Sequence, residues 1–169
     1  MGPAAGWDAD TAVEELYAGH YRSLVRLSSL LVRDRETAEE VVQDAFVAMH
    51  GRWAALREPD KAVAYLRQAV VNRSRSVLRH RGVQARHVRA VVPDRSATDD
   101  PAHALARRSA VLDALAELSA RQREVLVLRY YLDLSEADVA ATLGISRGAV
   151  KSHTSRGVAA LRPLMEDLT

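Results

Sequence analysis

The residues best suited to chemistry in this sequence are basic and polar side chains near its end. Arg147, Lys151 and Ser155 recur at intervals of four residues, so they share one face of any helix that contains them. Guanidinium, ammonium and hydroxyl groups bind phosphate and the edges of bases in the major groove of DNA. The spacing therefore predicts a helix with a DNA-contacting face. A solvated basic face without a partner is the alternative.

A second basic stretch lies in the middle of the chain. Residues 61–95 contain nine basic residues and one acidic residue, with Tyr65 and Asn72 among them. Cations beside an aromatic ring and an amide suit single-stranded nucleic acid, because its backbone needs positive charge and its unstacked bases need a surface on which to stack. Residues 8–60, by contrast, contain eleven acidic and six basic residues. This asymmetry predicts one face for a polyanion and another for a protein partner.

Other kinds of chemistry have little support. The six histidines lack metal-ligand spacing, and no nucleophile elbow or phosphate-binding glycine loop is present. We therefore expect no metal site, no catalysis, no cofactor and no small-molecule substrate. The chain has no cysteine, which excludes disulfides and fits a reducing compartment. No run of 18 apolar residues and no secretion signal occur, so we expect a cytoplasmic protein without membrane insertion.

The composition indicates which elements position these side chains. The 169 residues are 48% hydrophobic and 27% charged, which is typical of globular proteins. With 8 Gly, 5 Pro and 5% aromatic residues, the mixture favours helix over sheet and predicts an all-α fold. The length has room for two small helical domains of about 70 residues each.

Apolar periodicity and capping residues predict three helices in the first half. They cover residues 11–31, capped by Asp10, residues 35–50, capped by Asp34, and residues 61–80, capped by Asp60. Residues 51–60 are predicted to form a loop, and Gly82 is expected to end the third helix. Residues 82–100, with Pro93 and a polar run, predict a flexible linker.

Four helices are predicted in the second half. The first covers residues 101–118, and the second follows a capping box that begins at Ser119. A short helix follows Ser135 and stops at Gly144; the last helix follows Ser146, and Pro163 should bend or end it. The chain thus divides into a tail (1–10), a first domain (11–81), the linker (82–100) and a second domain (101–169).

The third and fourth of these helices have the features of a helix-turn-helix. Two helices that cross steeply over a tight turn need a small residue at their contact, a turn residue that tolerates positive φ, and an apolar anchor on the second helix. Ala140, Gly144 and Val150 supply these three features in order. The motif puts the basic face described above on its second helix. An ordinary helical hairpin is the alternative.

Several motifs along the chain occur together in a known family. The chain contains Glu40-Val41-Val42-Gln43-Asp44-Ala45-Phe46, then Trp53, then Tyr65-Leu66-Arg67 with Asn72, and finally the helix-turn-helix. In order and spacing these resemble the extracytoplasmic-function (ECF) group of bacterial sigma factors, over about residues 11–81 and 104–162. The resemblance implies a sigma-2 and a sigma-4 domain, binding to core RNA polymerase, recognition of the −10 and −35 promoter elements, and help in opening the DNA.

The resemblance also implies roles for individual residues. It assigns the −35 element to Arg147, Gly148, Lys151, Ser152, Ser155 and Arg156. It assigns the −10 element to Arg57, Glu58, Lys61, Tyr65, Asn72 and Arg75, and the clamp of the polymerase β′ subunit to Glu39, Glu40, Gln43 and Asp44. The polymerase β flap and an anti-sigma factor are further partners that it implies.

Two other functions are compatible with the same residues. In a conventional regulator the helix-turn-helix would bind an operator, and the first domain would dimerise or sense a signal. In an adaptor the acidic first domain would bind a protein, and the basic helix would be incidental. For a sigma factor we expect the linker to let the two domains close on each other in solution, which would hide the basic stretch.

Overall fold

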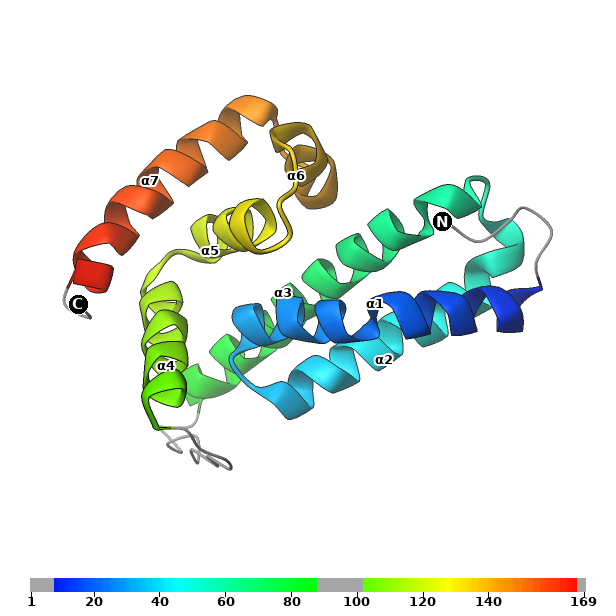
Figure 1. The fold of residues 1–169 in the computed structure, drawn as a ribbon, viewed down its shortest axis with the longest axis horizontal. Helices are drawn as coiled ribbons and strands as arrows, with labels where there is room; N and C mark the ends of the chain where they lie inside the picture. Colours follow the sequence, from blue (N-terminus) through cyan, green and yellow to red (C-terminus); the bar gives the residue numbers. More distant parts are fainter. Residues whose placement is uncertain (1–7, 88–101, 167–169) are drawn as a thin grey trace.

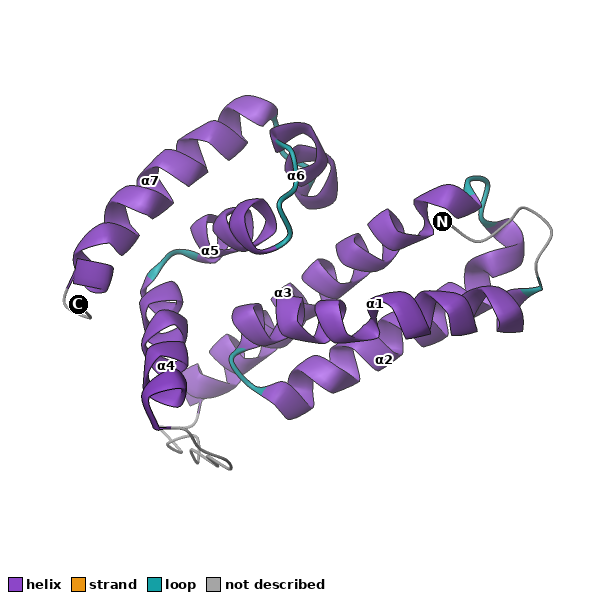
Figure 2. Ribbon diagram, viewed as in Figure 1, coloured by secondary structure: helices purple, strands orange, loops and turns teal. Residues whose placement is uncertain are grey.

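The computed structural model describes residues 8–87 and 102–166, and this part of the chain contains helices and no strand (Figure 2), which confirms the predicted all-α fold. The helices form two units (Figure 1). The first unit comprises α1 (Ala9–Val32), α2 (Arg35–Arg52) and α3 (Ala62–His87). The second comprises α4 (Ala102–Glu117), α5 (Ala120–Leu126), α6 (Glu136–Leu143) and α7 (Arg147–Glu166).

The first unit is a bundle in which α1, α2 and α3 lie side by side (Figure 1). Leu27 of α1, Val42 of α2 and Leu66 of α3 are completely buried in its core. The hydroxyl groups of Ser28 and Ser74 meet at 2.9 Å inside this core and join α1 to α3. Because a buried hydroxyl without a partner costs free energy, this pair fixes how the two helices face each other.

Acidic residues begin the first two helices. Asp34 caps α2 as predicted, and hydrogen bonds from the Thr37 side chain and backbone hold the pKa of Asp34 below its usual value. The predicted cap of α1 is wrong. Asp8 caps it instead, accepting a hydrogen bond from the Thr11 backbone N–H at 2.8 Å. Asp10 lies within the first turn, where its carboxylate is 2.7 Å from the imidazole of His50.

The segment predicted as a loop, residues 51–60, is more regular than expected. The helix α2 continues to Arg52, and two short 3₁₀ helices follow, η1 (Trp53–Ala55) and η2 (Pro59–Lys61). Trp53 is buried in the core of the first unit, which ties the segment to the bundle. Asp60 lies within η2 and α3 begins at Ala62, so the predicted cap of the third helix is also wrong.

The third helix does not end at Gly82 but continues to His87. Arg81 holds this end against the first two helices, because its guanidinium donates to the Val32 carbonyl at 3.2 Å and to the Thr37 hydroxyl at 2.6 Å. A glycine inside a helix costs only about 1 kcal/mol, which such contacts can offset. The predicted linker therefore begins later than residue 82, and its remaining residues, 88–100, lie outside the described residues.

In the second unit the predicted caps are confirmed. Ser119, Ser135 and Ser146 each accept a hydrogen bond from a backbone N–H in the first turn of α5, α6 and α7. Ser119 and Gln122 form the reciprocal capping box. The continuation of α5 as a single π-helical turn, η3 (Val127–Tyr131), was not predicted.

Of the two outcomes predicted for Pro163, a bend or an end of the last helix, the second does not occur, because α7 passes through Pro163 and extends to Glu166. Proline cannot donate to the carbonyl four residues earlier, which here belongs to Ala159. Both residues are exposed, so water can reach that carbonyl. The helix therefore tolerates a proline on its solvent side.

The two units pack against each other in a closed arrangement. One hydrophobic cluster includes buried residues of both, and α1 contacts η3 while α3 contacts α6. Polar contacts support this packing. Arg33, at the end of α1, pairs with Asp113 of α4, and Arg123 of α5 reaches the Leu31 carbonyl at 3.5 Å. The two units are thus packed together as expected, but the basic stretch is not hidden as a whole, because Arg75 is half-buried while Lys61 and Arg79 stay exposed.

Candidate functional site

The turn between α6 and α7 is built as the sequence predicts. Gly144 has φ of +66°, in the left-handed region that glycine adopts without strain. The backbone N–H of Ile145 donates to the Ala140 carbonyl at 3.1 Å, which closes the end of α6. Val150 is completely buried and anchors α7 to the unit. These features make α6 and α7 a helix-turn-helix.

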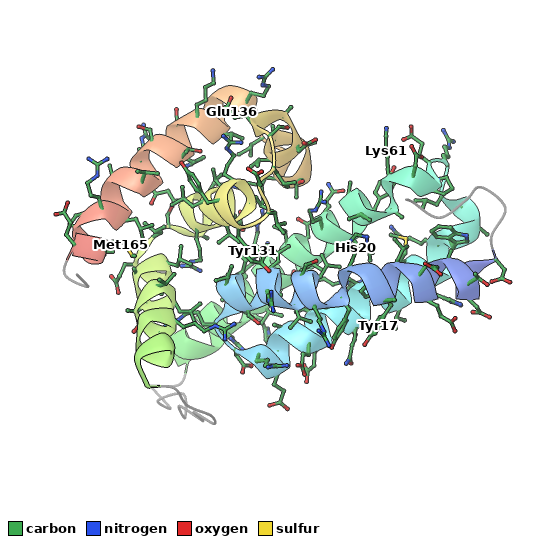
Figure 3. The ribbon with its side chains drawn as sticks, in the orientation of Figure 1. Tyr17, His20, Lys61, Tyr131, Glu136 and Met165 are labelled. Atoms are coloured by element: carbon green, nitrogen blue, oxygen red, sulfur yellow. The ribbon has the colours of Figure 1, made fainter. Side chains whose placement is uncertain are left out.

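All six residues predicted on the −35 face lie on the exposed side of α7. They are Arg147, Gly148, Lys151, Ser152, Ser155 and Arg156. Lys151 Nζ is 3.9 Å from the carboxylate of Glu136, which lies in the first turn of α6 and beside the start of α7 in Figure 3. An exposed pair at this distance is weak, so the Lys151 ammonium can turn to another anion.

A residue of α7 that the sequence analysis overlooked explains how closely this helix approaches α5. Gly157 is buried, and a Cβ atom placed on it would lie 2.9 Å from Cδ1 and 3.1 Å from Cγ of Leu126. Only a residue without a side chain fits between the helices. The position follows the apolar stripe of α7, but the sequence alone gives no sign that Leu126 packs on it.

Four of the six residues predicted for the −10 element gather where η1, η2 and α3 meet. Arg57, Glu58, Lys61 and Tyr65 are all exposed there, and Figure 3 shows Lys61 at the end of the first unit where α3 begins. Lys61 and Glu58 form an ion pair at 2.9 Å, and the hydrogen bond that Lys61 donates to the Glu58 carboxylate raises the pKa of Lys61. The cluster offers a cation, a carboxylate and an aromatic ring to a single strand.

The other two residues lie farther along α3, and they differ from each other. Asn72 is exposed. Arg75 is half-buried against the second unit, where its guanidinium donates two hydrogen bonds of 2.9 Å to the carboxylate of Glu124. This contact raises the pKa of Arg75 and keeps it charged. In the closed form, therefore, Arg75 is already bound by a protein anion.

Glu124 was not predicted to have a role. Its side chain is 6% exposed, and it accepts a further hydrogen bond from Arg121 at 3.0 Å. Next to it, Arg123 donates to the carbonyls of Leu115, Ala116 and Leu118, and burial lowers its pKa. The only hint in the sequence is a charged residue directly before the apolar run of α5, and it does not reveal a partner 49 residues away.

The residues predicted for the polymerase lie together on α2. Glu40, Gln43 and Asp44 are exposed, while Glu39 is half-buried and accepts a hydrogen bond from Arg35 at 2.9 Å. Val47, one turn beyond Gln43, is 72% exposed and adds an apolar side chain to the same face. An acidic and amidic surface with one apolar residue suits a basic partner surface.

Two kinds of feature were not found among the described residues. Within residues 8–87 and 102–166, no group of three or more His, Asp or Glu residues is arranged to hold a metal ion. No helix in this part of the chain is both long and apolar enough to cross a membrane.

The two units correspond to two regions of one protein class. Residues 16–83 match the model of sigma-70 region 2, and residues 108–161 match that of sigma-70 region 4. The chain is also 35% identical to the RNA polymerase sigma-E factor of Streptomyces avermitilis, over 90% of this chain and 84% of that protein. It is 34% identical to the ECF RNA polymerase sigma factor SigL of Mycobacterium tuberculosis, over 90% of this chain and 88% of that protein.

Solved structures agree on the fold. CnrH, in complex with the cytosolic domain of CnrY, has a TM-score of 0.74 and 24% identity, covering 95% of this chain and 91% of that one. RpoE from Bartonella quintana, in complex with the anti-sigma factor NepR, has a TM-score of 0.71 and 24% identity, covering 90% of this chain and 96% of that one. The chain belongs to the ECF sigma factors. It is a transcription initiation factor that recognises promoters together with RNA polymerase.

Proposed function

We propose that α7 reads the −35 element through Arg147, Lys151 and their exposed neighbours. One observation supports this most directly: all six predicted residues are exposed on one side of α7, while the buried Val150 anchors the other side of the helix. Arginine and lysine near the start of such a helix reach base edges and phosphates in the major groove. The side chains at the start of α3, Arg57, Glu58 and Lys61 with Tyr65, would hold the −10 strand, with Asn72 and Arg75 farther along it.

The acidic face of α2 is proposed to bind the β′ clamp of core RNA polymerase, and the second unit to bind the β flap. In this scheme the protein itself performs no covalent chemistry and acts in the cytoplasm, where the polymerase works. We propose the same two domains as the sequence analysis, except that the first begins at Asp8, the cap of α1, and extends to the end of α3 at His87. CnrH and RpoE were both solved as complexes with a protein partner, and the partner of RpoE is an anti-sigma factor. We therefore also propose an anti-sigma factor as a regulator of this chain.

In the closed arrangement, two proposed interactions of Arg75 exclude each other. Arg75 can hold either Glu124 or the −10 strand, because one guanidinium cannot make the same bidentate contact twice. We therefore propose that the units separate when the protein joins the polymerase and the promoter. The same closure that shields Arg75 in the free protein would keep it from binding DNA without the polymerase.

Run-off transcription with purified core RNA polymerase tests the proposed −35 contact. Genome-wide mapping of run-off products first identifies the promoters, and Arg147→Ala and Lys151→Ala are then compared on them. Each substitution is expected to cost about 1–3 kcal/mol of binding to the promoter if the side chain reads a base edge, and less if it contacts phosphate. Arg162→Ala, on an exposed position of the same helix outside the face, is the matched control. Normal transcription by both face variants would refute the placement of α7.

A further inference from the structure

A cavity lies between the two units, and of the residues proposed to contact DNA or the clamp only Glu39 lines it. Its volume is about 700 Å³, and its walls come from α1 and α2 on one side and from α4 and η3 on the other. Each unit contributes one tyrosine, Tyr21 from α1 and Tyr131 from η3. Figure 3 shows Tyr131 where the second unit faces α1. Cavities of this size bind small organic molecules in many proteins.

Positive charge predominates in the lining of this cavity. Four arginines line the cavity, against a single carboxylate, that of Glu39, which is already bonded to Arg35. Among the described residues, Arg22, Arg26 and Arg108 have no hydrogen-bond or ion-pair partner. Arg22 and Arg26 are four residues apart on α1, a spacing at which like charges repel and destabilise a helix. Within the described part of the chain, neither of these two guanidinium groups forms an ion pair that would offset the repulsion.

Apart from Ser29, the remaining lining is apolar. Val25 and Leu30 come from α1, and Val111 and Leu112 come from α4. Guanidinium groups bind carboxylate, sulfonate and phosphate through paired hydrogen bonds, and tyrosine rings stack on flat ligands. The lining therefore matches a molecule that has both an acidic group and an apolar ring.

We propose that this cavity binds a small organic anion with an aromatic body, as a regulatory ligand and not as a substrate. Arg22 and Arg26 from α1 and Arg108 from α4 bind the acidic group, and Tyr21 and Tyr131 contact the ring. Because both units supply walls, the ligand binds the closed arrangement and not the separated units. It thus stabilises the closed form by mass action.

The regulatory consequence rests on the proposed function of Arg75. A ligand that favours the closed form also favours the Arg75–Glu124 contact, and so it opposes engagement of the promoter. Binding to the cavity itself does not depend on that role. Two quantities are therefore measured separately. A fluorescent probe reports binding to the cavity, and a transcription assay reports the effect of the bound ligand on engagement of the promoter.

The probe is 8-anilinonaphthalene-1-sulfonate, titrated into the full-length protein and followed by its fluorescence. We expect saturable binding at one site, and at least tenfold weaker binding of the uncharged N-phenyl-1-naphthylamine. Arg26→Gln and Arg108→Gln should each weaken probe binding about tenfold, because each removes a charge-assisted contact. Arg162→Gln, an exposed arginine of α7, is the matched control and should bind as the parent does. Circular dichroism verifies that all three variants are folded.

A second variant tests the cavity without removing charge. Val111 is 37% exposed, so Val111→Trp can fill the cavity without disturbing a buried core, and it should abolish probe binding. Equal binding of the probe to the parent, the arginine variants and Val111→Trp would overturn the proposal, as would equal binding of the uncharged analogue. An acidic helical peptide that binds these arginines where the probe does not would also overturn it, in favour of a protein partner. If the probe binds as expected but leaves transcription unchanged, the site stands and its regulatory role is wrong.

Discussion

At the scale of single residues, Glu124 is the side chain on which the closed arrangement depends most. It is almost fully buried, and two arginines from different units donate to it, Arg75 from α3 and Arg121 from α5. A buried carboxylate is stable only while such partners satisfy it. The same acid that completes the interface therefore also occupies a residue proposed to bind DNA.

Glu124→Gln tests this interface directly. Glutamine keeps the shape of the side chain but loses its charge, so the free energy of unfolding should fall by about 1–3 kcal/mol. Urea denaturation followed by circular dichroism measures the change. Glu117→Gln, at an exposed glutamate of α4, is the control and should change the stability by no more than about 0.5 kcal/mol. Equal midpoints for the two variants would contradict the role of Glu124.

Gly157 offers a second test, in which the sign of the effect is informative. In an open helix position, replacing glycine by alanine stabilises a protein by about 0.5–1 kcal/mol. At Gly157 the new methyl group would meet buried Leu126, so Gly157→Ala should instead destabilise the protein by about 1–3 kcal/mol. Gly19→Ala in α1, where nothing lies within 4 Å of the added atom, should be stabilising. Thermal denaturation compares the two; stabilisation by both would show that α5 and α7 are less tightly packed than described here.

At the scale of elements, local signals predicted most of the helices. Asp34, Ser119, Ser135 and Ser146 begin helices as expected, because a cap and the apolar pattern after it lie within a few residues of each other. The exposed face of α7 could be predicted for the same reason. Its periodicity alone separates Val150 from the basic side chains.

The caps of α1 and α3 were misassigned by a few residues, but the other errors came from contacts between distant parts of the chain. The end of α3 depends on Arg81 reaching α1 and α2, which no local pattern contains. The contact between Arg75, which was predicted for the −10 element, and Glu124 was also missed, because it links residues of two different units. The closeness of Gly157 to Leu126 likewise became visible only once α5 and α7 were placed together.

The proposed polymerase contact of α2 can be tested by charge reversal. Reversing Glu40 and Asp44 together to lysine should weaken binding to core RNA polymerase about tenfold or more, because it replaces complementary charges by repelling ones. Fluorescence anisotropy with labelled protein measures the affinity, and circular dichroism verifies the helices. Reversing Glu14 and Glu15, exposed on α1, makes the same change of net charge elsewhere and should leave the affinity nearly unchanged. Unaltered affinity of the α2 variant would remove this face from the polymerase interface.

At the scale of the whole molecule, two units that share a hydrophobic cluster must nevertheless act at two promoter elements. The chain between α3 and α4 therefore has to be long enough for them to separate. Deleting residues 88–95 removes about 26 Å of reach, at roughly 3.3 Å per residue. Run-off transcription from promoters with both elements should fall at least tenfold.

The control for this deletion replaces residues 88–95 by eight glycine and serine residues, which keeps the length and discards the sequence. It should transcribe nearly as well as the parent. Because the deletion leaves both units intact, circular dichroism of the shortened protein should be unchanged. Normal transcription by the shortened protein would mean that the units do not act across an extended connection.

The central claim is that the free protein is closed and opens when it binds core RNA polymerase. Energy transfer between dyes on Ala18→Cys in α1 and Ala159→Cys in α7 measures the separation of the two units. Both positions are exposed, and the chain has no other cysteine. Transfer should be high in the free protein, lower in free protein that also carries Glu124→Gln, and low for both once core enzyme is added. The same transfer in the presence and absence of core enzyme, with no effect of Glu124→Gln, would contradict the account.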